Sequence, residues 1–236
     1  MPTSLKVRFK VGIGKKIPQR LLNNTLLLFP FLYKTKFFNY EAYQAKKSIR
    51  DLIDGLNMTK NLPGDIIECG CARCGTTAIL AKYLKTNQIR KKYYALDSFE
   101  GFRLEELQRE KDKGLTEASK KAFTYNSYEY ALKKIKKLGL SERVVLVKGY
   151  FQETLPNIDS RFCMGFIDCD LSESVRYAAE TIWPRLVNGG ILLFDEYGFE
   201  NFRGVTNVVD KFVRDHSQQI ESHGQSRLLY LVKKTI

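Results

Sequence analysis

Acidic residues stand at the ends of several apolar segments of this chain, where carboxylates can do chemistry. Asp168 and Asp170 follow one such segment, and Asp195 and Glu196 follow another. Four carboxylates in one cleft are costly unless a cation or a shared proton neutralises them. A hard divalent ion, Mg²⁺ before Ca²⁺ or Mn²⁺, is the partner that suits such oxygen ligands. The alternative is a set of exposed acids that water solvates.

A further acid, Asp97, ends the segment Tyr93–Leu96 and begins the sequence Asp97-Ser98-Phe99-Glu100-Gly101. In nucleoside-binding α/β folds, an acid at the end of the second strand accepts hydrogen bonds from ribose hydroxyls. Asp97 is the candidate for that role. A turn cap is the alternative, because Asp often closes a turn through its own backbone.

A glycine-punctuated turn joins an apolar run to a helix-forming segment in Asp65-Ile-Ile-Glu-Cys-Gly-Cys-Ala-Arg-Cys-Gly75. We expect Gly70 and Gly75 to take positive φ and to let a ligand approach the backbone, with the N-terminal amides of the next helix facing it. The spacing is not the G-x-G-x-x-G of dinucleotide binders. Glu68 before Gly70 suits a cationic, amino-acid-like ligand, of which S-adenosylmethionine is the common example. An ordinary tight turn without a ligand remains the alternative.

Strand-like and helix-like segments alternate along most of the chain. This order predicts an α/β fold with a mostly parallel, doubly wound sheet, and ligands at the carboxyl ends of its strands. The expected strands are 65–69, 93–96, 144–147, 164–167, 190–194 and 228–232. The expected helices are 76–85, 127–137, 172–186 and 205–215.

Two segments fall outside this alternation. Apolar positions between Tyr40 and Leu56 recur with a helical period, so a helix is expected to lead into the first strand. The charged insert from Arg103 to Lys121 lacks a clear apolar stripe and is either a lid over the site or a solvent-exposed connection. We divide the chain into a basic helical extension, residues 1–57, and an α/β domain, residues 58–236.

The basic charge of the chain is concentrated near its start. The 236 residues carry a formal net charge of +13, and residues 1–50 hold eleven Lys or Arg against one acid, Glu41. Such a segment could bind an anionic membrane surface, a phosphorylated substrate or a nucleic acid. A solvated, lysine-rich leader is the alternative.

No apolar stretch reaches the ~18 residues of a membrane span, and no small-residue cleavage site follows the apolar run near residue 30. We expect a cytoplasmic protein, with the basic leader allowing peripheral contact with a membrane. The five cysteines form an odd set without a secretory signal, which favours buried free thiols over disulfides or a zinc site.

From about Pro63 to Phe212, five motifs in the same order resemble the macrocin-type sugar O-methyltransferases. They are Glu68-Cys-Gly70-Cys-Ala-Arg73-Cys-Gly75, Asp97-Ser-Phe-Glu-Gly101, Gly149-Tyr-Phe-Gln-Glu-Thr-Leu-Pro156, Asp168-Cys-Asp170-Leu-Ser-Glu-Ser174 and Asp195-Glu-Tyr-Gly198. The resemblance implies a Rossmann-like class I methyltransferase fold, an enzyme dependent on S-adenosylmethionine and Mg²⁺, and a sugar or glycan hydroxyl as the acceptor. Glu196 stands where the family usually has a second aspartate, and Ala72 where an aromatic residue is common.

Roles follow from the resemblance position by position. It implies that the cofactor contacts Glu68, Gly70, Arg73, Gly75, Thr76, Asp97, Ser98, Phe99, Gly149, Tyr150, Phe151 and Asp168. It also implies that Asp168, Asp195 and Glu196 bind the metal and that Asp170 is the catalytic base.

Two other functions stay open from the sequence. A nucleic-acid methyltransferase would use the leader as an arm along the phosphate backbone, although a carboxylate cluster without metal would repel phosphate. A non-catalytic module would keep the fold and dock through the leader. The sequence leaves the oligomeric state open, with a homodimer among the options.

Overall fold

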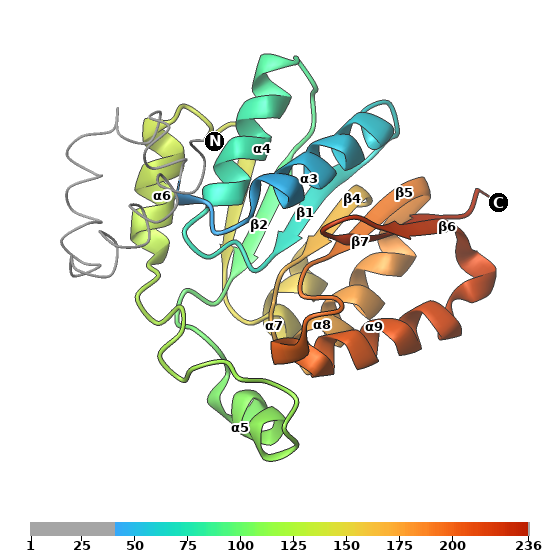
Figure 1. Cartoon of the computed structure of the whole chain (residues 1–236). Coiled ribbons are helices and arrows are strands. Elements are labelled where there is room, and N and C mark those ends of the chain that lie inside the picture. The colour runs from blue at the N-terminus through green and yellow to red at the C-terminus, as the bar shows by residue number, and fades with distance from the viewer. Residues whose placement is uncertain (1–40, 236) are drawn as a thin grey trace, which may run out of the picture.

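The computed structural model describes residues 41–235, and the basic leader that the sequence singles out lies outside them apart from its last residues. A seven-stranded sheet forms the centre of the molecule (Figure 1), in the order β3-β2-β1-β4-β5-β7-β6. β7 pairs antiparallel with both of its neighbours, and the other pairings are parallel. The strands are β1 (Asp65–Cys69), β2 (Tyr93–Asp97), β3 (Val144–Lys148), β4 (Phe162–Ile167), β5 (Leu186–Phe194), β6 (Ile220–Gln225) and β7 (Leu229–Lys233).

The strand order reverses direction between β1 and β4. From β1 the chain moves outward through β2 to β3, and then returns to place β4 on the other side of β1. In a parallel sheet this reversal opens a crevice at the carboxyl ends of the two strands. Because β2, β4 and β5 run parallel, Asp97 at the end of β2 and the acids after β4 and β5 lie at one edge of the sheet, as the sequence predicts.

Helices cover both faces of the sheet (Figure 1). Alternate strand residues point to opposite faces, so Ile66 packs in one buried apolar cluster and Ile67 in the other. The first cluster includes side chains of α3, α4 and α6, and the second includes side chains of α8 and α9. The helices are α3 (Lys46–Thr59), α4 (Gly75–Thr86), α5 (Leu104–Asp112), α6 (Tyr128–Lys137), α7 (Phe151–Thr154), α8 (Ser172–Ile182) and α9 (Arg203–Asp215). This arrangement confirms the predicted doubly wound α/β fold.

The segment before β5 differs from its prediction. The expected helix 172–186 ends at Ile182, a short 3₁₀ turn covers Trp183–Arg185, and β5 starts at Leu186 rather than at Gly190. Pro184 is the physical reason, because proline lacks the amide proton that an α-helix needs at that point.

The α3 helix belongs to the same core as the sheet. Leu52 and Leu56 are fully buried in the apolar cluster that includes strands β1, β4 and β5. The boundary proposed between residues 57 and 58 falls inside this helix. The division into two parts stays a proposal, and the packing of α3 favours a boundary nearer the start of the chain.

The charged insert contains a helix, α5, which packs through buried acids as well as through apolar Leu107. Glu106 accepts hydrogen bonds from the backbone amide and hydroxyl of Ser174, at 2.8 and 2.9 Å. Glu110 accepts from the hydroxyl of Ser172 at 2.6 Å and from its amide. The N-cap residue of α8 makes no side-chain cap of its own. The two glutamates therefore cap α8 from another helix, where negative charge is favoured.

The edge strand β6 was not predicted, because its mostly exposed residues, Glu221 to Gln225, lack an apolar alternation. Within residues 41–235, no helix is long and apolar enough to cross a membrane. All five cysteines are free and buried, as expected.

Candidate active site

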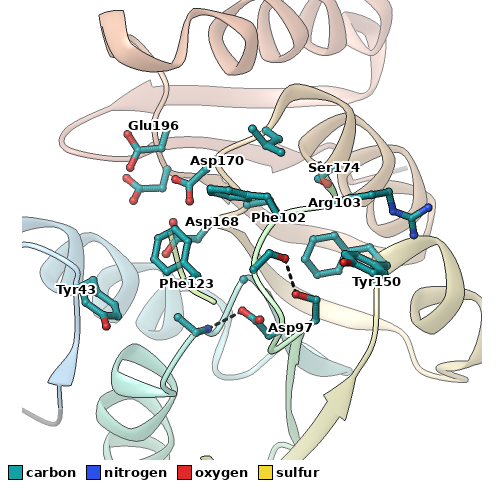
Figure 2. Close-up of a pocket in the computed structure, with 18 of the residues that line it drawn as sticks. Tyr43, Asp97, Phe102, Arg103, Phe123, Tyr150, Asp168, Asp170, Ser174 and Glu196 are labelled. Carbon is teal, nitrogen blue, oxygen red and sulfur yellow. Dashed lines mark hydrogen bonds between the residues drawn. The ribbon is translucent and has the colours of Figure 1, made fainter. Parts of the chain in front are cut away.

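A cavity of about 260 Å³ lies at the carboxyl ends of β1, β2 and β4, where the strand order reverses. Figure 2 shows Asp168, Asp170 and Glu196 at one end of this pocket and Arg103 and Tyr150 at the other. The predicted site residues that line it are Gly70, Asp97, Ser98, Gly149, Tyr150, Phe151, Asp168, Asp170, Asp195 and Glu196. The fold therefore brings most of the predicted site together.

Five predicted cofactor residues do not line this pocket: Glu68, Arg73, Gly75, Thr76 and Phe99. Glu68 is fully buried inside β1 and accepts a hydrogen bond from the Thr77 hydroxyl. The Arg73 guanidinium is buried too, ion-paired with Glu41 and 4.8 Å from the ring centre of Tyr130. Their contact with the cofactor remains an expectation.

The two loop glycines differ from each other. Gly70 has a φ of +95°, and a Cβ there would lie 1.8 Å from the carbonyl oxygen of Asp168, so only glycine fits. Gly75 does not take positive φ, and the left-handed positions of the loop are Ala72 and Cys74 instead. A Cβ on Gly75 would lie 2.3 Å from the backbone nitrogen of Ala42. Gly75 thus makes room for residues 41–45, which we call the strap, rather than for a ligand.

Asp97 holds two loops through its carboxylate. One oxygen accepts from the amide of Ala72 at 2.8 Å, and the other accepts from the amide of Phe99 at 2.7 Å (Figure 2 shows the bond to Ala72). Burial raises the pKa of Asp97, and these backbone hydrogen bonds act against that rise. Each oxygen keeps a second lone pair, so the turn-capping role and the predicted ribose contact are compatible.

The far end of the pocket combines a basic and an aromatic side chain. Arg103 lies over the Tyr150 ring with its guanidinium carbon 4.3 Å from the ring centre, and it pairs with Glu153 at 3.2 Å. Gly149 precedes Tyr150 with a φ of +139°. This corner offers a flat aromatic surface beside backbone, which suits the predicted adenine contact.

Three carboxylates come together at the other end of the pocket. Asp168, Asp195 and Glu196 each offer an oxygen, and these oxygens lie within 4.8 Å of one another. Asp168 follows β4 and Asp195 follows β5, which pairs with β4. Asp170 lines the same pocket outside this group of three. Asp170 and Glu196 have positive φ, at 63° and 56°, a conformation that costs about 1–3 kcal/mol per residue and is concentrated at functional sites.

Burial and mutual repulsion raise the pKa values of Asp168, Asp170 and Glu196. Burial first, and then the charge of Asp195, raise the pKa of Asp168 well above its usual range. Burial and the charges of Asp195 and Asp97 raise the pKa of Asp170 to about 7. Burial and the charges of Asp195 and Asp170 raise the pKa of Glu196 to about 8. A cation among these oxygens would remove most of the repulsion.

Two polar side chains that the sequence did not single out also reach these carboxylates. The amide nitrogen of Gln44 donates to Asp168 at 2.9 Å and to Asp195 at 2.6 Å. Arg227 donates to the other oxygen of Asp195 at 2.8 Å. Gln44 and Arg227 lie far in sequence from Asp168 and Asp195, so no local motif could have identified them.

Aromatic side chains from two segments form a wall near the carboxylates. Phe123 contacts Phe102 edge to face at 5.5 Å between ring centres, and Tyr43 of the strap at 6.2 Å. All three line the pocket, and Tyr43 is more than half exposed (Figure 2). An aromatic wall beside polar groups is typical of pockets for small organic ligands.

Comparison with known proteins assigns the chain to a family. The sequence model of the macrocin-O-methyltransferase (TylF) family matches residues 44–223. A tetracenomycin-C rhamnosyl 4'-O-methyltransferase of Streptomyces olivaceus is 26% identical over 157 residues, which are 62% of this chain and 58% of that protein. The chain thus spans less than two thirds of the length of this relative.

A demethyldecarbamoylnovobiocin O-methyltransferase of Streptomyces niveus is 26% identical over 189 residues, 71% of this chain and 68% of that protein. The crystal structure of a calicheamicin methyltransferase superposes with a TM-score of 0.67 at 19% identity and covers 91% of each chain. This structural likeness shows a class I methyltransferase fold. The family match extends over well over half of the sequence and includes both the glycine loop and the carboxylate cluster, so the chain belongs to the macrocin O-methyltransferase family.

Proposed function

We propose that this protein transfers a methyl group from S-adenosylmethionine to a hydroxyl of a sugar or of a sugar-linked small molecule, with a divalent cation, Mg²⁺ first, at the carboxylate cluster. One observation carries the proposal: a single pocket joins the loop after β1 and Asp97 to the acids after β4 and β5. One relative is named as a 4'-O-methyltransferase of a rhamnosyl tetracenomycin and another as an O-methyltransferase of demethyldecarbamoylnovobiocin, which supports a sugar-linked small molecule as the acceptor.

The pocket offers separate places for the two substrates. Gly70, Asp97 and Tyr150 line one part of the pocket, at the carboxyl ends of parallel strands, and we expect them to bind the cofactor there. Tyr43 and Phe123 contact each other and line the same pocket, where they can pack against the apolar face of an acceptor. Holding both substrates in line for transfer is the main contribution that the protein can make.

The carboxylate cluster fits a divalent cation by its donor chemistry. Asp168, Asp195 and Glu196 supply only oxygen ligands, which is the set that hard ions such as Mg²⁺ prefer. A bound cation would lower the pKa of a coordinated hydroxyl, since metals depress the pKa of water from about 15.7 to about 7 in the best cases.

Asp170 is the base in this proposal. It lines the pocket beside the three carboxylates without belonging to the group whose oxygens cluster most closely, so its carboxylate is left to accept a proton from a hydroxyl bound in the pocket. As the acceptor oxygen forms its bond to the methyl carbon and the carbon–sulfur bond breaks, the hydroxyl proton passes to Asp170.

The Asp170→Asn variant tests this assignment. We expect it to bind S-adenosylhomocysteine as the wild type does and to lose about 10²–10⁴-fold in turnover, because the amide cannot take the proton. Release of S-adenosylhomocysteine over a panel of sugars and glycosides measures turnover. Asp54→Asn on the exposed side of α3 is the control and should keep full activity. Wild-type turnover in Asp170→Asn would show that Asp170 is not the base.

The basic leader and the location of the protein remain part of this proposal. Contact with an anionic membrane or a phosphorylated substrate would go through residues outside the described range, in a cytoplasmic protein. A nucleic-acid acceptor is the rival, and it predicts turnover on RNA or DNA that falls steeply with salt.

A further inference from the structure

The strongest unassigned feature of the pocket is Gln44, whose amide nitrogen spans two of the three clustered carboxylates. Its distances to Asp168 and Asp195 are 2.9 and 2.6 Å, and it approaches one oxygen of each. Its own carbonyl oxygen, Oε1, is buried and has no hydrogen-bond partner among residues 41–235. A buried acceptor without a partner costs about 1–3 kcal/mol, so its position calls for an explanation.

A side-chain amide can offer either end to the same neighbours. Its oxygen and nitrogen are nearly the same size, and rotation about the terminal bond exchanges them. Toward carboxylates alone, the nitrogen donates. Toward a cation held between those carboxylates, the oxygen is the end that binds, and neutral amide oxygens are ordinary ligands of hard divalent ions.

We propose that Gln44 is a fourth protein ligand of the cation site and turns its amide oxygen toward a bound divalent ion. This rests on the cation in the proposed function. The three carboxylates leave open positions on an ion that takes six or more oxygens, and Gln44 can fill one of them beside water and the acceptor hydroxyl. Gln44 adds a ligand without adding further negative charge to a cluster that already repels itself.

The strap is fixed well enough for this role. Glu41, at its start, is buried, forms an ion pair with Arg73 and accepts a hydrogen bond from the Tyr130 hydroxyl. It also lies 3.2 Å from the Nζ atom of Lys134, which is fully buried on α6. Because Gly75 has no side chain, Ala42 lies directly against the first turn of α4. These contacts hold Gln44, three residues after Glu41, over the carboxylates.

The assignment has a structural consequence for the strap. If Gln44 ligates the ion, cation binding and the docking of the strap stabilise each other. Backbone amides near Gln44 should then exchange hydrogen more slowly with MnCl₂ than without it.

Titration of the full chain with MnCl₂ tests the proposal without an activity assay. Gln44→Leu keeps the bulk of the side chain and removes both polar ends. We expect its Mn²⁺ affinity to fall about 10-fold or more, the range seen when groups around a metal are removed. Gln218→Leu, at an exposed glutamine, is the control and should bind as the wild type does.

The opposite result is equally clear. If Gln44 only occupies the place of a cation, Gln44→Leu removes a competing donor and Mn²⁺ binds as tightly as in the wild type, or more tightly. That outcome overturns the proposal. If circular dichroism shows that Gln44→Leu does not fold, Gln44→Ala takes its place, and its Mn²⁺ affinity is interpreted in the same way.

Hydrogen exchange of the peptide that contains the strap gives a second readout. Slower exchange with MnCl₂ in the wild type, absent from Gln44→Leu, supports ligation. Failure of the wild type to bind Mn²⁺ would overturn this inference together with the cation in the proposed function, while S-adenosylhomocysteine binding would still test the methyltransferase proposal separately.

Discussion

At the scale of single residues, the acids were predictable and their neutral and basic neighbours were not. Asp97, Asp168 and Asp195 follow apolar strands, so the sequence alone predicts a shared edge for them. Gln44 is 124 residues away from Asp168, in a segment without a motif. Its place depends on how Glu41 docks the strap, which is a property of tertiary packing. The same holds for Arg73, which pairs with Glu41 instead of lining the pocket.

Glu68 gives a prediction about stability at this scale. Burial raises its pKa from 4.5 to about 7 in the folded chain. The folded protein therefore keeps a proton that the unfolded chain releases at lower pH, and stability falls as pH rises between about 4.5 and 7. The full shift corresponds to about 3 kcal/mol.

Glu68→Gln, which resembles the protonated acid, should lose this part of the pH dependence and be more stable than the wild type above pH 7. Urea unfolding at several pH values measures it, with the exposed Glu105→Gln as control. Other buried acids titrate in both proteins, so the difference between the two curves is the quantity to compare. Parallel curves for wild type and Glu68→Gln would contradict the assignment.

At the scale of elements, the spacing of apolar residues predicted the regular helices and strands. It failed where contacts other than apolar packing hold an element in place. The α5 segment shows no apolar stripe because it is held largely by Glu106 and Glu110 at the start of α8. Such a contact has no local signature. The expected end of the helix at residue 186 was wrong although the sequence contains the signal, because Pro184 disfavours a helix that continues past Ile182.

The capping by α5 predicts a cost for removing its acids. Glu106→Ala should lower the free energy of unfolding by about 1–2 kcal/mol, because the amide and hydroxyl of Ser174 lose their acceptor. Glu105→Ala, one residue earlier on the exposed side of α5, should change it by less than about 0.5 kcal/mol. Equal effects from the two substitutions, in chemical denaturation, would show that α5 does not cap α8.

At the scale of the whole molecule, the doubly wound sheet follows from the alternation of strands and helices, and the position of the pocket follows from the reversal between β1 and β4. The edge strand β6 was missed because exposed edges need little apolar pattern. The order of motifs identified the family, and the family match to residues 44–223 confirms it. The side chains of the pocket wall decide which acceptor binds, and relatives of low identity do not share enough of these side chains to identify it.

Isothermal titration of the purified protein with S-adenosylhomocysteine, with and without MgCl₂, tests the central claim most directly. The proposed site predicts one molecule bound per chain with micromolar affinity, and an affinity or enthalpy that changes when MgCl₂ is present. Absence of binding in both conditions would contradict the methyltransferase proposal for this chain.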